Sequence, residues 1–320
     1  MQRSSELNIV IVCYNCGVEI CRLLADIVEG DLPLESINFF VVDNASSDDS
    51  RTLLRALQLP RIHLIESEHN LGFAAGCNLG ARAITNLGTK TDANKAPILF
   101  LNPDVRLQHD SLSNLLTFAR ENPHCGIWGG FTCNTQGELD GKSAWREPAL
   151  LDLVCWSLGL DRLFSRVLGR TSGGYSRRSL QKSGEVDAIS GCFLLIDHTL
   201  FRRLDGFDED FFLYSEEIDL CRRARCLGAR PRVTERALIM HAGSQTLSGF
   251  NKLNHLYRSK VRYFHKHGSA LKVAVARRLI ALGSQLRFLG FAVLSLGDSR
   301  FVSRRDLWRN FIASQRQWKL

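Results

Sequence analysis

One pattern repeats through the first half of the chain: an apolar run, a polar junction and a segment with helical spacing of apolar residues. The apolar runs are residues 7–12, 37–42, 62–66 and 98–101. The helical segments after the first three runs are residues 17–26, 48–57 and 74–87, and Ser46, Ser47 and Asp48 are predicted N-caps. This alternation predicts βα units and a parallel sheet. The polar junctions then share the carboxyl edge of the sheet, where ligands of open α/β sheets bind.

The fourth run ends abruptly at Asn102, Pro103 and Asp104. Pro103 has no N–H for a ladder and ends the strand, which places Asp104 in a loop where its carboxylate can face a divalent cation. All three are also common turn residues, so the triplet alone does not define a site. The polar residues that follow the other apolar runs supply the further evidence for a site.

The length of the chain allows one sizeable α/β domain or a domain with an appendage. Its first residues are polar and lack the apolar core of a signal peptide, and we expect no run that approaches the roughly 18 apolar residues of a membrane span. The sequence therefore predicts a cytoplasmic protein.

The basic charge belongs to the last part of the chain. Residues 257–320 carry 14 Lys and Arg against 2 Asp and Glu, and because the whole chain carries +8, residues 1–256 carry −4. Residues 270–297 mix apolar side chains with Lys272, Arg277, Arg278 and Arg287, a composition that suits a peripheral helix on an anionic membrane surface at the inner face. Packing on the main domain, or on a second subunit of a homo-oligomer, is an equal alternative. We expect no nucleic acid partner, since no nucleic-acid motif is present.

The ten cysteines lack a paired spacing, which is typical of small buried apolar residues rather than of a disulfide framework. Cys13 and Cys16 are the exception. A C-x-x-C at a strand-to-helix junction is compatible with a redox pair or with half of a zinc site, for which Cys221 and Cys226 are the nearest second half.

Sequence patterns typical of strands and helices resume at residue 186. An apolar run over residues 186–196 is interrupted at Ser190 and Gly191, and a helix is predicted from near Ser215 to Leu227 with Gly228 as its C-cap. A last strand is predicted over residues 232–240. Residues 131–183, rich in glycine and basic side chains, are predicted as a partly mobile insertion.

Motifs in a fixed order run through both halves, at residues 9–15, 41–48, 70–80, 101–104, 190–192, 206–209, 212–223 and 241–243. Together they resemble the family 2 glycosyltransferases of the rhamnosyltransferase type, over about residues 7–265. The resemblance implies an α/β protein of GT-A fold, in which a Rossmann-like nucleotide-binding sheet is fused to an acceptor-binding half. The implied parts are a nucleotide-sugar-binding half at residues 1–130, a variable insertion or lid at 131–185, an acceptor and catalytic half at 186–256, and a basic helical extension at 257–320.

The resemblance also implies where the nucleotide binds. Asp43 would accept a hydrogen bond from a pyrimidine base, with Tyr14 and Asn15 nearby. The other residues implied in nucleotide binding are Asn44, Asn70, Gly72 and Asn102. The alternative for Asp43 and Asn44 is a turn that leads into the next helix.

A Mg²⁺ or Mn²⁺ cofactor is implied in the same way. Asp104 matches the last acid of the family's D-x-D motif, and Asn102 stands where an acid is often found. One carboxylate is compatible with Mg²⁺, which commonly binds through one or two carboxylates together with phosphates and water. His241 stands where related enzymes place a histidine by the metal, and its nitrogen suits Mn²⁺ better. A structural role at a strand end is the alternative for His241.

The family motif makes Glu217 the base that deprotonates the acceptor hydroxyl, supported by Glu216 and Asp219. A base on the face opposite the leaving group implies displacement with inversion. The alternative is that three acids in one turn simply favour the positive end of a helix.

The expected function is an inverting, metal-dependent transfer of a sugar from a nucleoside-diphosphate sugar, with dTDP-L-rhamnose as the first choice of donor. The expected acceptor is a saccharide, on a polyprenyl carrier, of a cell-surface polysaccharide. A non-catalytic sugar-nucleotide-binding or scaffold protein is the alternative. A dinucleotide-dependent oxidoreductase is disfavoured, because Gly72, Gly76 and Gly80 follow the third strand at a spacing of four and do not form the fingerprint of a first βα turn.

Overall fold

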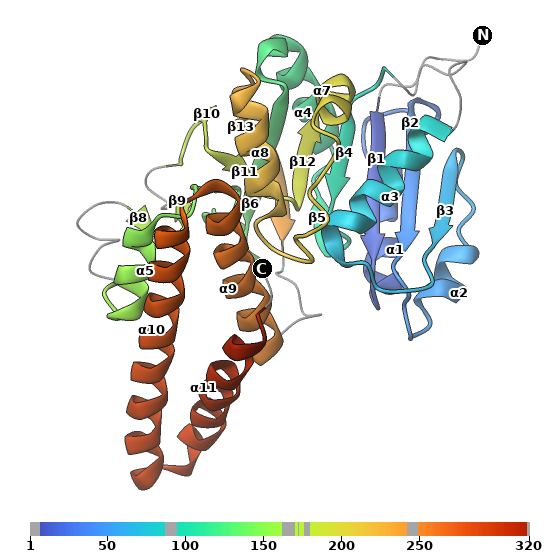
Figure 1. The fold of residues 1–320 in the computed structure, drawn as a ribbon. Coiled ribbons are helices and arrows are strands. Elements are labelled where there is room, and N and C mark those ends of the chain that lie inside the picture. The colour runs from blue at the N-terminus through green and yellow to red at the C-terminus, as the bar shows by residue number, and fades with distance from the viewer. Residues whose placement is uncertain are drawn as a thin grey trace. The chain divides into compact units, whose positions relative to one another are not determined.

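The computed structural model of the chain describes residues 7–86, 95–161, 170–171, 173–175, 180–241 and 249–318. It divides into two compact units (Figure 1). Unit 1 comprises Met1–Arg146, Leu180–Phe212 and Glu216–Thr246, and unit 2 comprises Glu147–Ser179, Leu213–Ser215 and Leu247–Leu320. Residues on both sides of the predicted insertion therefore belong to unit 1, whereas most of the insertion groups with the C-terminal helices.

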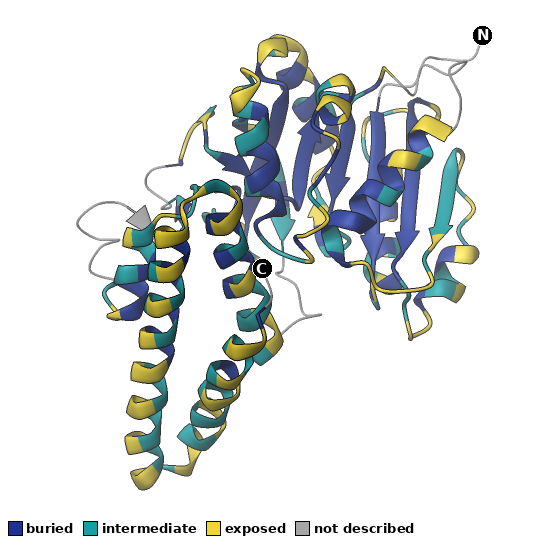
Figure 2. Cartoon of the chain, viewed as in Figure 1, coloured by how far each residue is buried: buried dark blue, intermediate teal, exposed yellow. Residues whose placement is uncertain are grey.

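The four apolar runs are the parallel strands β1 (Leu7–Cys13), β2 (Ile37–Asp43), β3 (Ile62–Glu66) and β4 (Ile98–Leu101). They lie side by side in the order β4-β1-β2-β3, and every residue of β1, β2 and β4 is buried (Figure 2). The predicted parallel sheet is confirmed for this part of unit 1.

Strands from the second half extend the same sheet. They are β5 (Val105–Leu107), β6 (Ile127–Cys133), β10 (Gly184–Glu185), β12 (Phe193–Ile196) and β13 (Arg232–His241). Strand β12 lies antiparallel between β4 and β6, β13 lies parallel to β6, and β5 and β10 pair antiparallel with β13. The predicted boundary at residue 130 falls inside β6. Short strands β7 (Ala144–Trp145) and β11 (Ala188–Ile189) pair with each other.

Helices cover the sheet of unit 1. They are α1 (Gly17–Val28), α2 (Ser50–Arg55), α3 (Gly72–Asn86), α4 (Ser111–Glu121), α7 (His198–Arg203) and α8 (Glu216–Cys226), with short 3-10 turns η1 (Leu34–Ser36) and η3 (Pro123–Cys125). Helix α3 packs closely on β1, because a Cβ at Gly76 or Gly80 would lie 2.9 Å from Val12 or 2.5 Å from Val10. The glycines that could suggest a dinucleotide fingerprint are therefore packing residues.

Helix α2 begins later than predicted. The carboxylate of Asp48 accepts from the backbone N–H of Ser50 at 3.0 Å, whereas the hydroxyl of Ser50 accepts from the N–H of Gly17 at 2.8 Å and that of Ser46 accepts from the N–H of Asn15 at 3.0 Å. The two serines thus bind the junction that follows β1 instead of capping their own helix. Helix α8 starts and stops as predicted, and Gly228 has a φ of 92° just beyond its end.

Unit 2 is helical, as expected for the C-terminal extension. Its helices are α5 (Leu150–Ser157), α9 (Gly249–His267), α10 (Ala270–Gly297) and α11 (Val302–Ser314), with 3-10 turns η4 (Ser299–Phe301) and η5 (Gln315–Gln317) and a pair of short strands β8 (Arg170–Thr171) and β9 (Gly174–Tyr175). Its buried core includes Trp156, Tyr257, Phe264, Ile280 and Phe311. Helix α10 packs against α5, α9 and α11.

The expectation that no run approaches a membrane span is wrong for α10. This helix has 28 residues and contains an 18-residue window of mean hydropathy 1.7, of which 17% is buried. By length and composition it is apolar enough to cross a membrane.

Candidate active site

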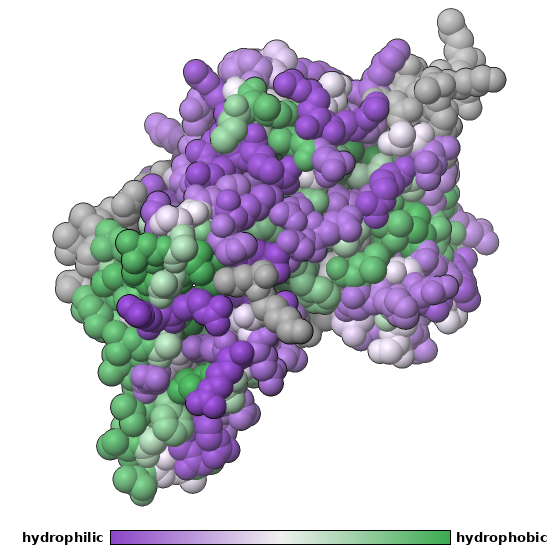
Figure 3. Space-filling view, viewed as in Figure 1, coloured by the Kyte–Doolittle hydropathy of each residue, from purple (hydrophilic) through white to green (hydrophobic). Residues whose placement is uncertain are grey.

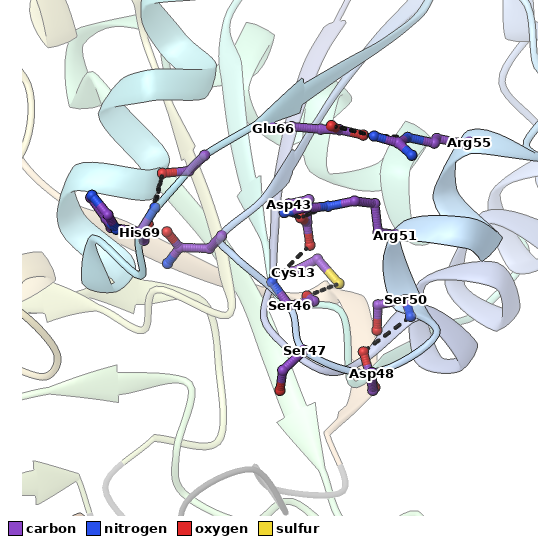
Figure 4. Close-up of polar contacts among 12 residues, drawn as sticks. Cys13, Asp43, Ser46, Ser47, Asp48, Ser50, Arg51, Arg55, Glu66 and His69 are labelled. Carbon is purple, nitrogen blue, oxygen red and sulfur yellow. Dashed lines mark hydrogen bonds and ion pairs between the residues drawn. The ribbon is translucent and has the colours of Figure 1, made fainter.

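The carboxyl ends of β1, β2 and β3 lie side by side, because the strand register pairs Cys13 with Asp43 and Asp43 with Glu66. Figure 4 shows hydroxyls, carboxylates and two arginines gathered at this edge, with Arg51 directed at Asp43 and Arg55 at Glu66. The polar edge predicted from the junctions is present.

Asp43 is fully buried, and Arg51 holds its carboxylate. Nε and Nη2 of Arg51 donate to Oδ2 of Asp43 at 2.9 and 2.8 Å, and the backbone N–H of Ser46 donates to Oδ1 at 3.3 Å. A nucleotide base that binds Asp43 must therefore form a hydrogen bond to Oδ1 or displace Arg51 from Oδ2. The hydrogen bond from a nucleotide base to Asp43 stays a prediction, and it also depends on the position of Arg51.

Tyr14 and Asn15 form the junction after β1. Asn15 has a φ of 55°, a left-handed conformation that asparagine tolerates better than most residues. Its N–H donates to Ser46 Oγ at 3.0 Å and its Oδ1 accepts from the N–H of Ser47 at 2.8 Å. These bonds tie the junction after β1 to the one after β2. Tyr14, the residue before Asn15, is 36% exposed, and its contact with a nucleotide base stays a prediction.

Asn44, Asn70 and Gly72 are joined in one hydrogen-bonded network. Nδ2 of Asn44 donates to Asn70 Oδ1 at 3.1 Å and to the carbonyl of Gly72 at 3.0 Å, and Oδ1 of Asn44 accepts from the N–H of Leu71 at 2.9 Å. The amide of Asn44 is occupied by protein groups. In this structure it shapes the loop before α3.

Gly72 connects that loop to the segment before α8. It has a φ of 81°, and a Cβ there would lie 2.2 Å from the carbonyl oxygen of Phe212. The same carbonyl accepts from the N–H of Phe73 at 2.8 Å. Only glycine permits this close approach.

Asp104 and His241 lie together although they are far apart in the sequence. Strand β5 follows Asp104 and pairs with the end of β13, so Oδ1 of Asp104 lies 3.4 Å from Nε2 of His241. Within the described part of the chain, Oδ2 of Asp104 and both ring nitrogens of His241 are buried and find no hydrogen-bond partner. One carboxylate and one imidazole are donors that a divalent cation such as Mn²⁺ accepts, so these residues fit the implied metal.

Among the residues that the structure describes, no group of three or more His, Cys, Asp or Glu could hold a metal ion. Asp104 and His241 would therefore supply two protein ligands, and diphosphate oxygens and water would supply the others. The side chain of Asn102 has no role assigned by the contacts; its backbone N–H donates to the carbonyl of Cys192 at 3.1 Å.

Glu216 and Glu217 begin α8 and are both buried, 3% and 8% exposed. Tyr214 and Ser215 before them have φ values of 71° and 69°, a rare conformation for two consecutive residues other than glycine. Burial raises the pKa of Glu216 well above its usual range, and the adjacent charge of Glu217 raises it further. Two residues with strained backbone conformations thus lead directly into two buried acids.

The turn at Ser190, Gly191 and Cys192 lies near Glu217 and near the loop that leads to Asp104. A Cβ at Gly191 would lie 3.9 Å from the Cβ of Glu217. Burial raises the pKa of Cys192 to about 12, and the charges of Asp104 and Glu217 also raise it. The backbone N–H of Asn102, two residues before Asp104, donates to the carbonyl of Cys192 at 3.1 Å, so the loop with Asp104 and the first turn of α8 both border this turn.

Asp219 differs from its two neighbours. It is fully buried, and its Oδ2 accepts from Nε of Arg223 at 2.7 Å. The other guanidinium nitrogens of Arg223 donate to the carbonyls of Leu204 and Gly206 at 2.6 and 2.8 Å. This ion pair anchors the loop after α7, so the contacts give Asp219 a structural role.

Cys13 and Cys16 are buried with their sulfurs 3.4 Å apart. The hydrogen bond from Cys16 lowers the pKa of Cys13 to about 7, although burial opposes it. All ten cysteines are free, and eight are buried as predicted. With no larger ligand group in the described ranges, the half zinc site gains no support.

Two polar residues with a clear part in the site region were missed by sequence reasoning. Arg51 stands eight residues after Asp43, and only the burial of that carboxylate reveals the need for a cation. Asn78 donates to the carbonyl of Phe207 at 2.8 Å and accepts from its N–H at 2.9 Å. An amide between apolar residues on a buried helix face was the available signal.

Comparison with known proteins agrees with the motifs. The family described as Glycosyl transferase family 2 matches residues 8–204. Rhamnosyltransferase WbbL of Escherichia coli is 29% identical over 133 residues, which are 42% of this chain and 47% of that protein. The N-acetylglucosaminyl-diphospho-decaprenol L-rhamnosyltransferase of Mycobacterium tuberculosis is 29% identical over 67% of this chain and 68% of that protein. The chain thus spans about half to two thirds of the length of these relatives.

The fold agrees as well. The mannosyltransferase PcManGT from Pyrobaculum calidifontis, solved in complex with GDP-Man and Mn²⁺, has a TM-score of 0.58 at 17% identity and covers 98% of this chain and 84% of its own. Another neighbour, TarS of S. aureus, has a TM-score of 0.51 at 16% identity and covers 86% of this chain and 42% of its own. The predicted α/β fold of GT-A type, with a helical C-terminal region, is confirmed.

Proposed function

Because the chain belongs to glycosyl transferase family 2 and is a glycosyltransferase, we propose that it transfers L-rhamnose from dTDP-L-rhamnose, with inversion and with help from a divalent metal, to a saccharide acceptor on a polyprenyl diphosphate carrier. The product would serve cell-surface polysaccharide synthesis. The proposal places the protein in the cytoplasm. The single observation that carries it is that the loop with Asp104, which lies beside His241, and the turn of α8 with Glu217 both border residues 190–192.

The choice of sugar and acceptor rests on relatives. Two proteins similar to this chain are named rhamnosyltransferases, and the name of one includes a diphospho-decaprenol saccharide. The choice of metal rests on a structural neighbour solved with Mn²⁺ and on the nitrogen donor of His241.

The residues divide the chemistry between them. Asp104 and His241 would hold the metal ion, which when bound would stabilise charge on the departing diphosphate. Glu217 accepts the proton of the acceptor hydroxyl, and the hydroxyl oxygen forms a bond to the anomeric carbon as the bond to the diphosphate oxygen breaks. Attack from the face opposite the diphosphate inverts the anomeric centre. Glu216, whose raised pKa favours the neutral form, would avoid a second negative charge beside this base.

Calorimetric titration of the purified protein with dTDP, UDP and GDP, each with Mn²⁺ and again with a chelator, tests the proposal. We expect metal-dependent binding of dTDP alone. Selective binding of UDP or GDP would overturn the choice of donor. Binding of a nucleotide without transfer to any lipid-linked saccharide would favour the sugar-nucleotide-binding or scaffold protein.

A further inference from the structure

Helix α10 of unit 2 leaves an apolar face uncovered. Exposed side chains recur every three or four residues on this face, and we call them the leucine stripe: Leu282, Leu286, Leu289, Val293 and Leu296, which are 42%, 45%, 57%, 68% and 88% exposed. This spacing places them on one side of a helix. Figure 3 shows hydrophobic surface along α10, and Figure 2 shows exposed residues down the same helix.

We propose that the leucine stripe docks the protein onto an anionic lipid bilayer. The inference deepens the proposed function, since an acceptor on a polyprenyl carrier lies in a membrane, and it names the surface that would bring the protein there. Soluble proteins seldom expose a continuous apolar surface of this kind without a partner.

The segment around the stripe is apolar over its full length. From Leu279 to Gly297 the sequence contains one charged residue, Arg287. Its guanidinium lies 4.2 Å from the ring centroid of Trp156 and donates to the carbonyls of Trp156 and Gly283 at 2.5 and 2.9 Å. The charge is therefore directed into the core of unit 2 and away from the stripe.

Basic residues lie at both ends of the stripe. Lys272, Arg277 and Arg278 precede it, and Arg300 follows it with a side chain that is 87% exposed and lies 2.7 Å from the carboxylate of Asp298. Long basic side chains extend from an apolar surface to lipid phosphates, and cations near an anionic membrane strengthen binding. Apolar surface flanked by cations matches the chemistry of an anionic interface.

The partners of α10 indicate that it lies on the membrane and does not cross it. Helix α11 packs along α10 and carries Arg304, Arg305, Asp306 and Arg309, and the guanidinium of Arg304 lies 5.7 Å from the ring centroid of Phe291. A spanning α10 would draw these charges into hydrocarbon, which is strongly unfavourable. With α11 in place, only the outward face of α10 can enter the lipid.

A second copy of the chain is a less favourable occupant of the stripe. Each copy would bring the net charge of +12 of residues 257–320 against the same charge on its partner. Like charges at a contact are repulsive, whereas a surface of anionic lipids is attracted.

Flotation of the full chain with lipid vesicles tests the proposal. One set contains phosphatidylcholine only, and in the other phosphatidylglycerol replaces about a third of it, to supply negative surface charge. We expect binding to the anionic set to exceed binding to the neutral set by about tenfold or more. The double variant Leu289→Glu/Val293→Glu should lose at least about tenfold in binding, because both changes place charge in the lipid.

The matched control is Val28→Glu/Leu227→Glu, which adds the same charge at two exposed apolar residues of unit 1. It should bind vesicles within about twofold of the unchanged protein. Equal losses in both variants would show that net charge alone decides and would overturn the role of the stripe.

Analytical ultracentrifugation of the same proteins identifies the other occupant. A dimer that becomes a monomer in the stripe variant, with no flotation of the unchanged chain, would assign the stripe to a second copy and overturn the inference. Titration with dTDP separates this result from the proposed function: flotation without nucleotide binding would refute the donor proposal and leave the docking surface intact.

Discussion

Arg51 covers the carboxylate of Asp43, with two nitrogens 2.9 and 2.8 Å from the same oxygen. The acid is wholly buried, whereas the side chain of Arg51 is 37% exposed. The cation thus stands between this buried carboxylate and the solvent.

Loss of Arg51 should destabilise the protein, because it leaves a buried charge without its partner. We expect Arg51→Ala to cost about 2–4 kcal/mol in the free energy of unfolding. Arg55→Ala, which removes the more exposed ion pair with Glu66, should cost clearly less. Urea denaturation of both variants provides the measurement, and equal losses would contradict the account of Asp43.

Removal of Asp104 or His241 should abolish the effect of metal on nucleotide binding. For Asp104→Ala and His241→Ala we expect the affinity for dTDP in Mn²⁺ to fall at least about tenfold, while the affinity in chelator stays the same. Asp110→Ala, at an exposed acid, is the control for calorimetry. Unchanged metal dependence in both variants would show that the ion binds elsewhere.

Glu217→Gln should separate binding from chemistry, because the amide keeps the size of the side chain and cannot accept the proton. Transfer should fall by about 10²–10⁴, as is typical for loss of a general base, while dTDP binding stays within about twofold. Glu121→Gln, at an exposed acid bonded to Arg236, should keep full transfer. Normal turnover by Glu217→Gln would make the assigned base wrong.

Glu216→Gln should change how stability depends on pH. The raised pKa means that folded Glu216 keeps its proton at pH values where the unfolded chain has lost it, so its contribution to stability falls as pH rises above about 4.5, the unfolded value. In the variant, residue 216 does not titrate, so the free energy of unfolding of the variant relative to the unchanged protein should rise from pH 5 towards pH 8. Urea denaturation at a series of pH values provides the measurement.

The control for this pH series is Asp298→Asn. Hydrogen bonds from Arg300 lower the pKa of Asp298, so the contribution of Asp298 to stability is lost only in acid and should be flat over the same range. A flat difference for Glu216→Gln as well would refute the raised pKa.

Gly72→Ala should be costly for two reasons that a control can separate. Gly137 shares its positive φ, 78° against 81°, yet a Cβ at Gly137 meets nothing within 4 Å. Gly137→Ala should cost about 1 kcal/mol from backbone strain alone. Gly72→Ala adds a clash with the carbonyl of Phe212 and should therefore cost about 1–3 kcal/mol more than Gly137→Ala. Thermal unfolding of both variants provides the measurement. Equal shifts would argue that the loop moves aside freely.

The parallel part of the unit 1 sheet, β1 to β4, was predictable because its strands are mostly apolar runs that end in polar residues. The limits of β1 to β4 and α8 followed from such local patterns. The limits of α2 did not, because Ser46 and Ser50 bond to another junction, and a contact between distant segments leaves no local pattern. The apolar length of α10 was underestimated because scattered basic residues at its start obscured the stretch after Arg278, in which Arg287 is the one charged residue up to Gly297.

The site was predictable as a set of residues and less so as a geometry. Motif order pointed to Asp104, His241 and Glu217, but only the pairing of β5 with β13 brings the first two together. The environment of each acid was beyond prediction. Glu216 and Asp219 stand in one helical turn, yet one is desolvated near another acid and the other is held by Arg223.

Asn78 and Arg82 of α3 both reach Glu209, and Asn78 also bonds Phe207 through both of its amide atoms. The segment that leads to the acids of α8 is therefore fastened to a helix from the first half of the chain. Replacement of residues 186–241 by those of a relative, in order to alter the acceptor, would break these hydrogen bonds. Such a chimera must carry over the matching face of α3 as well, so the exchangeable unit is discontinuous in sequence.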